Sequence, residues 1–429
     1  MGVAVIRRRH VIYVEGYDPQ GAEGYHSLFA RSWKRFLKNW GFKARLGELQ
    51  LESQDFAHWE VEAAGPNWQV ATRYDFLRQE HIIRANMAEP MLRQVPRSLA
   101  WTFDYLVSGA IVRVLFASWE FGLALIHFQL MTIWALVLSI GGGWLIGSAA
   151  LNHFGVLGPV QLLISIIAAL AIFCAMRPFA ERWSVIQINN HWPYLCEFAR
   201  GEPTCFDASI EACAQRVIAA ARANEADEIV VIGHSGGGVL APAVITRALE
   251  LDGDVGRRGP PLVLLTLGSI APGAALHPSA EKLRAVFARL AVEPSITWVD
   301  VQSRKDALNF WDFDPVAGLG IKLDRERCNP IVWKVRFREM LSYDFYRRLR
   351  LNFFRLHYQF IMATDQRAPY DYFMLVAGPV PVAAWAKDPP GTLARFSADG
   401  SLVDGMFVSS TSDSRLVRSA PSPVGREVG

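Results

Sequence analysis

Residues 228–238 read Glu-Ile-Val-Val-Ile-Gly-His-Ser-Gly-Gly-Gly. The apolar, β-branched run at residues 229–232 predicts a buried strand, and the helical spacing of apolar residues in 239–250 predicts a helix. Between them a Gly-x-Ser-x-Gly pattern is centred on Ser235, with Gly233 and Gly237 where a side chain would collide with neighbouring backbone. A strand, this pattern and a helix in that order are typical of a tight turn that presents a nucleophilic serine.

Two backbone regions are candidates for binding an oxyanion beside this serine. The predicted helix points its N-terminus at Ser235, so the amide of Gly236 is one expected donor. The apolar residues 10–14 predict a strand that ends in the turn-rich residues 15–21, where Gly16 and Tyr17 are our candidates for the second donor. The alternative is an ordinary strand-to-helix turn, because Glu-Gly replaces the more usual His-Gly form of this loop.

Strand and helix patterns alternate along most of the chain. Helices are predicted at residues 27–40, 208–224 and 282–290, and further strands at residues 68–74, 261–267 and 296–301. This alternation predicts an α/β fold, in which a mostly parallel sheet carries helices on both faces. Functional side chains are then expected at the carboxyl ends of the strands.

That expectation selects an acid and a base. Asp306 lies on the loop that leaves the predicted strand 296–301, and it is our candidate for the carboxylate that orients a histidine. Asp300, Asp312 and Asp314 are the alternatives, each also compatible with a structural role. In the chain order serine, acid, histidine, the base must follow Asp306, and His357 is the one histidine that does.

Other histidines are weaker candidates for the base. A lone histidine in an aromatic-rich segment such as that around His357 is often a core residue, so His277 and His191 are kept as outside candidates. His234, inside the Gly-x-Ser-x-Gly pattern, is expected to face away from the position of a base.

Residues 121–176 contain no Asp, Glu, Lys or Arg. One helical membrane crossing needs about 20 apolar residues, so this stretch predicts two membrane helices, at residues 121–146 and 156–176, joined by a tight turn. Arginines flank the pair, whereas the turn has neither Lys nor Arg, which places both flanks in the cytoplasm. The alternative is a buried helical hairpin in a soluble protein. Residues 108–116 are a candidate interfacial helix before the first span.

Composition excludes several other classes of protein. The net charge of +3 comes without a basic cluster of the kind that nucleic-acid binding requires. The five cysteines lack metal-ligand spacing and a disulfide pattern, which favours reduced thiols and predicts no metal site. The N-terminal residues lack the apolar core of a signal peptide.

Four segments follow from these patterns. We expect residues 1–95 to form the first part of the α/β domain that contains Ser235, 96–182 a membrane insertion with both apolar helices, and 183–384 the second part of the domain. Residues 385–429 are polar and rich in turn formers, and they predict a disordered tail.

The chain resembles the α/β-hydrolase superfamily over about residues 10–75 and 180–365, through Gly-His-Ser235-Gly-Gly followed by Asp306 and His357 in family order. The resemblance is to lipases and esterases, in a bacterial branch associated with the inner membrane. It implies an ester-cleaving serine hydrolase without a cofactor, in which Ser235 attacks, His357 moves the proton, Asp306 holds the imidazole, and Gly236 and the loop at Gly16 bind the oxyanion. The expected partners are the lipid bilayer and a small-molecule or lipid ester.

Two further interpretations remain. A non-catalytic protein of the same fold would use the hairpin and the tail as a membrane scaffold. An acyltransferase would use the same three side chains with another acceptor in place of water.

Overall fold

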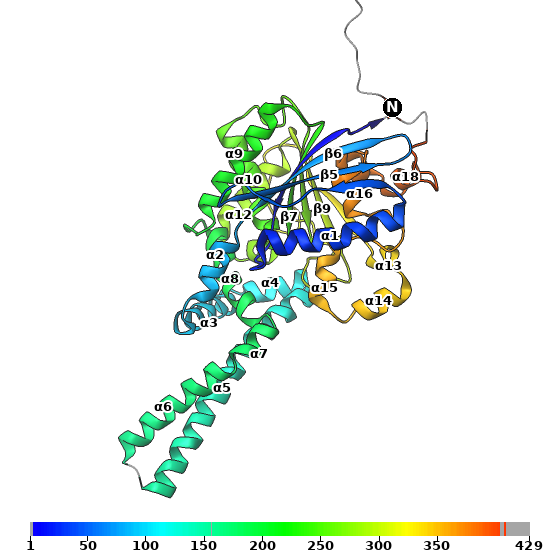
Figure 1. The fold of residues 1–429 in the computed structure, drawn as a ribbon. Coiled ribbons are helices and arrows are strands. Elements are labelled where there is room, and N and C mark those ends of the chain that lie inside the picture. Colours follow the sequence, from blue (N-terminus) through cyan, green and yellow to red (C-terminus); the bar gives the residue numbers. More distant parts are fainter. Residues whose placement is uncertain (1–2, 156, 404–406, 409–429) are drawn as a thin grey trace, which may run out of the picture.

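The computed structural model describes residues 3–155, 157–403 and 407–408. Its centre is a nine-stranded sheet in the order β10-β9-β8-β7-β2-β6-β5-β3, with β4 paired to β5 (Figure 1). The strands are β2 (Arg8–Val14), β3 (Lys43–Leu46), β4 (Gln50–Leu51), β5 (Phe56–Ala64), β6 (Gln69–Leu77), β7 (Glu228–His234), β8 (Leu262–Leu267), β9 (Ile296–Ser303) and β10 (Ile331–Val335). A separate pair joins β1 (Val3–Ala4) to β11 (Phe407–Val408).

The sheet is mostly parallel, which confirms the predicted α/β class. The neighbours from β10 through β6 pair in parallel, whereas β5 is antiparallel to β6, and both β3 and β4 are antiparallel to β5. The predicted strands overlap β2, β6, β7, β8 and β9. The antiparallel edge and β10 were not predicted.

Helices cover both faces of the sheet (Figure 1). They are α1 (Gly21–Trp40), α2 (Glu80–Ala88), α3 (Met91–Val107), α4 (Ala110–Ala117), α5 (Trp119–Phe154), α6 (Gly158–Ala175), α7 (Arg177–Arg182), α8 (Val185–Arg200), α9 (Asp207–Ala223), α10 (Gly237–Leu251), α11 (Ala271–Ala275), α12 (Glu281–Ala291), α13 (Phe337–Met340), α14 (Tyr343–Leu349), α15 (Phe353–His357), the 3₁₀ helix η1 (Tyr358–Ile361), α16 (Tyr372–Ala377), α17 (Val382–Lys387) and α18 (Pro389–Leu393). The chain between β6 and β7 contains helices and no strand among the described residues. Predicted helices overlap α1, α9, α10 and α12.

Successive strand residues belong to two different cores. In β7, Ile229 and Val231 pack into the cluster that includes residues of α9 and α10, whereas Val230 and Ile232 pack into the cluster that includes residues of α1 and α16. This alternation follows from the period of two along a strand. Because both faces are buried, the strand reads as a continuous apolar run, as the sequence pattern indicated.

Helices α5 and α6 form a hairpin that extends away from the sheet-containing part (Figure 1). Both are long and apolar enough to cross a membrane, and few of their residues are buried. The predicted boundaries were wrong for the first helix, because α5 continues through residues 147–154, which were assigned to the turn. Alanine, leucine and serine in that stretch are compatible with a helix, and Gly155, at φ +62°, ends it. The predicted interfacial segment 108–116 overlaps α4, which is bent by 77° from α3.

Small residues let the two hairpin helices approach closely. A Cβ atom at Gly143 would lie 2.4 Å from the carbonyl oxygen of Ser165, and one at Gly147 would lie 2.8 Å from that of Gln161. Small residues spaced four apart are a common means of packing membrane helices, since their backbones can then touch.

This packing predicts that Gly147→Leu loosens the hairpin, whereas Gly141→Leu does not, because a Cβ at Gly141 meets nothing within 4 Å. Overpacking of this kind costs about 1–3 kcal/mol. Hydrogen exchange measured by mass spectrometry in lipid nanodiscs should show faster exchange in α6 for the first variant alone. Equal protection in the two variants would contradict the close approach at Gly147.

The prediction of a disordered tail from residue 385 onward was wrong for residues 385–403. Trp385 is fully buried and donates a hydrogen bond from Nε1 to the carbonyl oxygen of Pro369 at 2.6 Å. The buried ion pair of Arg9 with Glu228 holds the chain just before this segment, because the Arg9 guanidinium also donates to the carbonyl oxygens of Gly378 and Val380. The polar composition of this segment gave no indication of these contacts. The remainder of the predicted tail lies outside the described residues, apart from β11.

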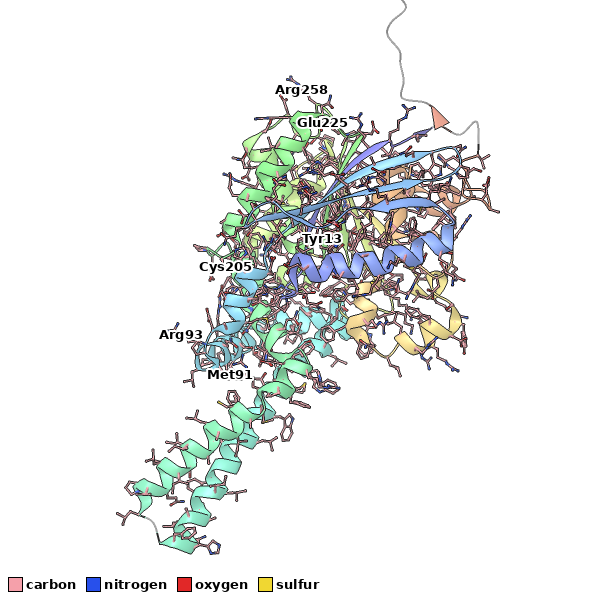
Figure 2. The ribbon with its side chains drawn as sticks, viewed as in Figure 1. Tyr13, Met91, Arg93, Cys205, Glu225 and Arg258 are labelled. Atoms are coloured by element: carbon pink, nitrogen blue, oxygen red, sulfur yellow. The ribbon has the colours of Figure 1, made fainter. Side chains whose placement is uncertain are left out.

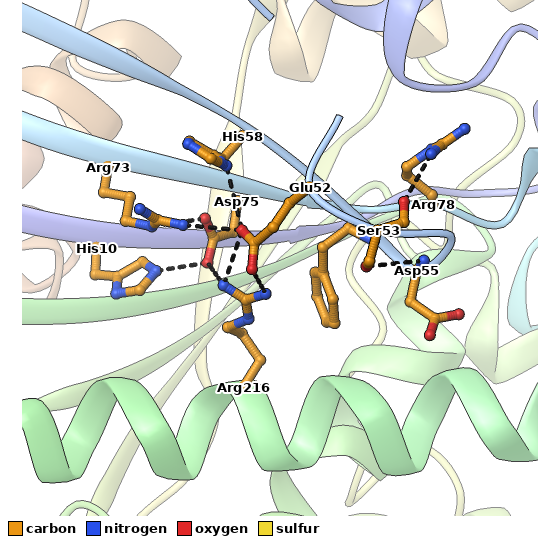
Figure 3. A network of polar contacts seen from close by, with 10 residues as sticks. His10, Glu52, Ser53, Asp55, His58, Arg73, Asp75, Arg78 and Arg216 are labelled. Carbon is orange, nitrogen blue, oxygen red and sulfur yellow. Dashed lines mark hydrogen bonds and ion pairs between the residues drawn. The ribbon is translucent and has the colours of Figure 1, made fainter. Parts of the chain in front are cut away.

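A network of charged side chains ties α9 to the antiparallel edge of the sheet (Figure 3). The buried carboxylate of Asp75 accepts from His10 and Arg73 at 2.9 Å, and from Arg216 of α9 at 3.3 Å. Arg216 and Arg73 also pair with Glu52. Glu52, His58 and Asp75 together have the donor atoms of a cation site. Because guanidinium groups already neutralise both carboxylates, we assign the network a structural role.

Candidate active site

Ser235 lies in the turn between β7 and α10 with a left-handed backbone, at φ +56°. A non-glycine residue in this region is uncommon, and it persists only where surrounding contacts enforce it. Here the Ser235 amide donates to the carbonyl oxygen of Leu267 at 3.0 Å, and the Ser235 carbonyl accepts from the amide of Gly238 at 3.0 Å. The predicted strand, turn and helix around the serine are therefore present.

Glycines around the turn allow three pieces of backbone to touch. A Cβ atom at Gly233 would lie 2.4 Å from the carbonyl oxygen of Gly237, and one at Gly237 would lie 2.1 Å from that of Val14. A Cβ atom at Gly16 would lie 3.2 Å from both the amide nitrogen of Gly236 and the Cβ atom of Ser235. The loop after β2 therefore lies against the turn after β7, which brings Gly16 beside the serine.

The backbone amides predicted to bind an oxyanion are available as donors. Within the described part of the chain, no acceptor is hydrogen-bonded to the amides of Gly16, Tyr17 or Gly236. Gly236 immediately precedes α10, so its amide belongs to the unsatisfied N-terminal end of that helix. The loop at Gly16 and the turn at Gly236 therefore each bring an unpaired amide close to Ser235.

Asp306 and His357 are in direct contact although 51 positions separate them in the sequence. The Oδ2 atom of Asp306 lies 2.6 Å from Nδ1 of His357, and both side chains are buried. The other carboxylate oxygen accepts from the amide of Leu308 at 3.0 Å. The Nε2 atom of His357 is buried and has no hydrogen-bond partner among the residues described. The pair thus has a fixed carboxylate and one imidazole nitrogen free to exchange a proton.

Ser235 and His357 line one cavity together with Gly16 and Tyr17. Its other walls are mostly apolar, and one is formed by the first turns of the hairpin helix α5, through Phe121, Ala124, Leu125 and Phe128. Tyr13, which also lines the cavity, lies within the sheet-containing part (Figure 2). Met91 and Arg93, which do not line it, mark the place where the hairpin leaves that part (Figure 2). The cavity therefore lies between the carboxyl end of β7 and the base of the hairpin.

The alternative acids are engaged elsewhere. Asp300 accepts from Thr266 Oγ1 at 2.5 Å and from Gln302 at 2.8 Å inside β9, and burial raises its pKa to about 6. Asp312 pairs with Lys334, and Asp314 pairs with Arg327 at 2.6 Å. None of these carboxylates contacts a histidine among the described residues, which leaves Asp306 as the partner of His357.

The other candidate histidines have different surroundings. His277 lies outside the cavity beside Asp104 and Arg200. His191 lines the cavity, stacked on the Tyr17 ring at 4.7 Å, and burial lowers its pKa to about 3. Its imidazole is therefore neutral, and it packs against Gly236. His234 does not face away as expected, because it lines the cavity 4.9 Å from the His357 ring.

Two features of the cavity were missed by the sequence analysis. Tyr358 donates from its hydroxyl to Asp18 at 2.6 Å, across the cavity wall. Glu15 is buried with Oε1 unpartnered within the described residues. Burial raises the pKa of Glu15 well above its usual range, and the nearby Asp18 and Glu80 add to the effect. A Glu-Gly pair after an early strand was the available signal, although nothing in it reveals a buried carboxyl group.

The raised pKa of Glu15 predicts a pH-dependent cost. Between the pKa of the unfolded chain, about 4.3, and the raised value, the folded protein binds more protons than the unfolded chain, so stability falls as pH rises. Glu15→Gln should remove this loss, making the variant more stable than wild type at pH 8 and equal to it near pH 4. Each tenfold change in the ionisation constant contributes about 1.4 kcal/mol.

Thermal unfolding in detergent between pH 4 and 9 measures this difference. The exposed Glu225, far from the cavity (Figure 2), provides the matched control Glu225→Gln. Parallel pH profiles for wild type and Glu15→Gln would show that the Glu15 carboxyl is not held neutral by burial.

Comparisons with known proteins identify no relative of this chain. No protein-family model, curated protein or solved structure matches it.

Proposed function

We propose that the protein is a membrane-anchored serine hydrolase of the α/β-hydrolase type that cleaves a carboxylic ester. The observation that carries this proposal is the Asp306–His357 contact beside Ser235 in one cavity, in the chain order serine, acid, histidine. A structural role alone does not require an acid, a base with a free nitrogen, and a strained serine at the same place.

The proposed reaction begins with attack of Ser235 Oγ on the ester carbonyl carbon. His357 accepts the serine proton at Nε2, and Asp306 stabilises the imidazolium that results. The amides of Gly236 and of Gly16 or Tyr17 bind the oxyanion, and His357 returns the proton to the departing alcohol. Water, activated by the same histidine, then attacks the acyl-enzyme carbonyl and releases the acid. An acyltransferase would differ in this last acceptor.

The apolar hairpin supports a two-pass membrane attachment. The arginines on both of its flanks favour a cytoplasmic location for the sheet-containing part. Helices α3, α4, α7, α14 and α15 gather at the end of the molecule from which the hairpin extends (Figure 1). Large apolar side chains are exposed on these elements and the loops between them: Leu92, Phe103, Leu106, Val107, Val112, Phe116, Phe179, Trp183, Tyr343, Leu351 and Phe353. Exposed aromatic and apolar groups of this kind suit the boundary between lipid headgroups and acyl chains. The bilayer of a bacterial inner membrane is therefore the proposed partner, and nucleic acid is not.

An activated serine is tested with a fluorophosphonate probe on the detergent-solubilised protein, followed by mapping of the labelled residue by mass spectrometry. Labelling is expected at Ser235 and lost in Ser235→Ala and His357→Ala. Asp306→Asn should slow labelling by about 10⁴-fold, because the imidazole is then held in the wrong tautomer. The matched variant His277→Gln, which changes a histidine outside the cavity, should still be labelled.

Each other outcome has a definite meaning. A folded protein that is not labelled would support the non-catalytic scaffold. Labelling that survives in His357→Ala but not in His277→Gln would move the base to His277.

The close approach of Gly16 to Gly236 predicts a selective loss of rate in Gly16→Ala. The added methyl group would crowd the Gly236 amide, which is proposed to bind the oxyanion. Loss of one such donor lowers kcat by about 10²–10³-fold, so a decrease of kcat rather than an increase of KM is expected with a short-chain ester. Gly253→Ala, where a Cβ meets nothing within 4 Å, is the control. Unchanged kcat in Gly16→Ala would exclude this loop from the oxyanion site.

A further inference from the structure

A second cavity adjoins the one that contains Ser235. It lies between α1 and the α14–α15 segment and encloses about 480 Å³. Three arginines line it, Arg31 and Arg35 from α1 and Arg355 from α15. The two cavities share Asp18, Tyr25 and Tyr358 in their walls. Because Tyr358 directly follows His357, this arginine-lined cavity is next to the proposed catalytic base.

Positive charge in the arginine-lined cavity is incompletely compensated. Arg35 lies 3.6 Å from Asp365 and stacks over the Phe345 ring at 4.7 Å, so it is held in place. Arg31 and Arg355 are exposed, and neither forms an ion pair within the described ranges. The one lining carboxylate, that of Asp18, accepts from the Tyr358 hydroxyl and from the Gln20 amide. Arg355 also lies over the Phe345 ring, at 5.9 Å, which leaves its N–H groups and those of Arg31 without an anionic partner in the described part of the chain.

The position of this cavity indicates where the anion comes from. Figure 1 shows α14 and α15 at the end of the molecule from which the hairpin extends, below α1. The chain around them exposes the apolar Leu351 and Phe353 and the cationic Arg347, Arg348 and Arg350. A surface with exposed apolar side chains and exposed arginines fits the headgroup layer of an anionic membrane.

We propose that the arginine-lined cavity binds the phosphate group of an amphiphilic ester, while the adjoining apolar cavity receives its acyl ester. Guanidinium groups match the oxygens of a phosphate in a planar, two-point geometry. In an acylated glycerol phosphate, the ester and the phosphate are carried on one small glycerol unit, which suits two cavities that share Asp18, Tyr25 and Tyr358 in their walls. The proposal rests on the proposed hydrolase function for the reaction, but the binding step can be measured without it.

The test uses the full-length protein in detergent and two ether lipids that cannot be hydrolysed, an alkylglycerol phosphate and the matched neutral alkylglycerol. The phosphate-bearing lipid should raise the temperature of thermal unfolding more than the neutral one does. Arg31→Gln combined with Arg355→Gln should abolish that difference. Arg347→Gln combined with Arg348→Gln removes the same charge from α14 outside the cavity and should preserve it.

The corresponding esters give the kinetic arm of the test. The ratio of kcat/KM for a monoacylglycerol phosphate to that for the matched monoacylglycerol should fall about tenfold or more in the cavity variant, since charged hydrogen bonds are lost. The ratio should stay at the wild-type value in the α14 variant.

Three results would overturn the headgroup assignment. One is an equal loss in both double variants, which would indicate general surface charge, and another is equal stabilisation by the neutral lipid. The third is the same stabilisation by inorganic phosphate alone, which would identify a site for the free anion. If the phosphate lipid binds as expected and no ester is cleaved, the hydrolase proposal fails and the binding site stands. If an ester is cleaved and the phosphate lipid does not bind in this way, the hydrolase proposal stands and the phosphate site fails.

Discussion

The close packing of backbone on backbone around Ser235 is the constraint on which the site depends. A Cβ atom at Gly237 would lie 2.1 Å from the Val14 carbonyl oxygen, so a side chain there would separate β2 from the N-terminus of α10. A Cβ atom at Gly16 would crowd the turn that holds the serine, at 3.2 Å. The parallel pairing of β2 with β7 brings the two carboxyl ends to the same edge of the sheet. The strained backbone at Ser235 and the free amides both follow from that contact.

The neighbouring strands supply the remaining groups at the same edge. Asp306 follows β9, and His357, at the end of α15 and after β10 in the chain, contacts it. The C-terminal helices α16 and α17 pack against strands of the same sheet. The Arg9–Glu228 pair is central to that attachment, because Glu228 Oε1 accepts from the amide of Val382 while Arg9 binds two carbonyls upstream. Buried charges are tolerated here because each has several hydrogen-bond partners.

Strongly periodic segments could be predicted from the sequence, and long-range contacts could not. The buried run before Ser235 and the apolar period after it are local signals, and β7 and α10 follow them closely. The position of Asp306 after a predicted strand selected the acid, and the chain order serine, acid, histidine selected His357 as the base, since one histidine follows the acid. By contrast, β5 alternates small, aromatic and charged residues and depends on its partners for pairing. The burial of Trp385 and the wall that α5 contributes to the cavity arise from segments distant in sequence, for which composition carries no signal.

Helix α5 joins two parts of the molecule that are often separate. At about 1.5 Å per residue, its 36 residues span roughly 54 Å, well beyond the hydrocarbon thickness of about 30 Å. Its first turns line the cavity, and its later turns pack against α6 through Gly143 and Gly147. One continuous helix thus lines a cavity at one end and, over the rest of its length, is apolar enough to cross a bilayer. The hairpin is consequently not an exchangeable module, because replacing α5 with an unrelated apolar helix would also remove a wall of the cavity.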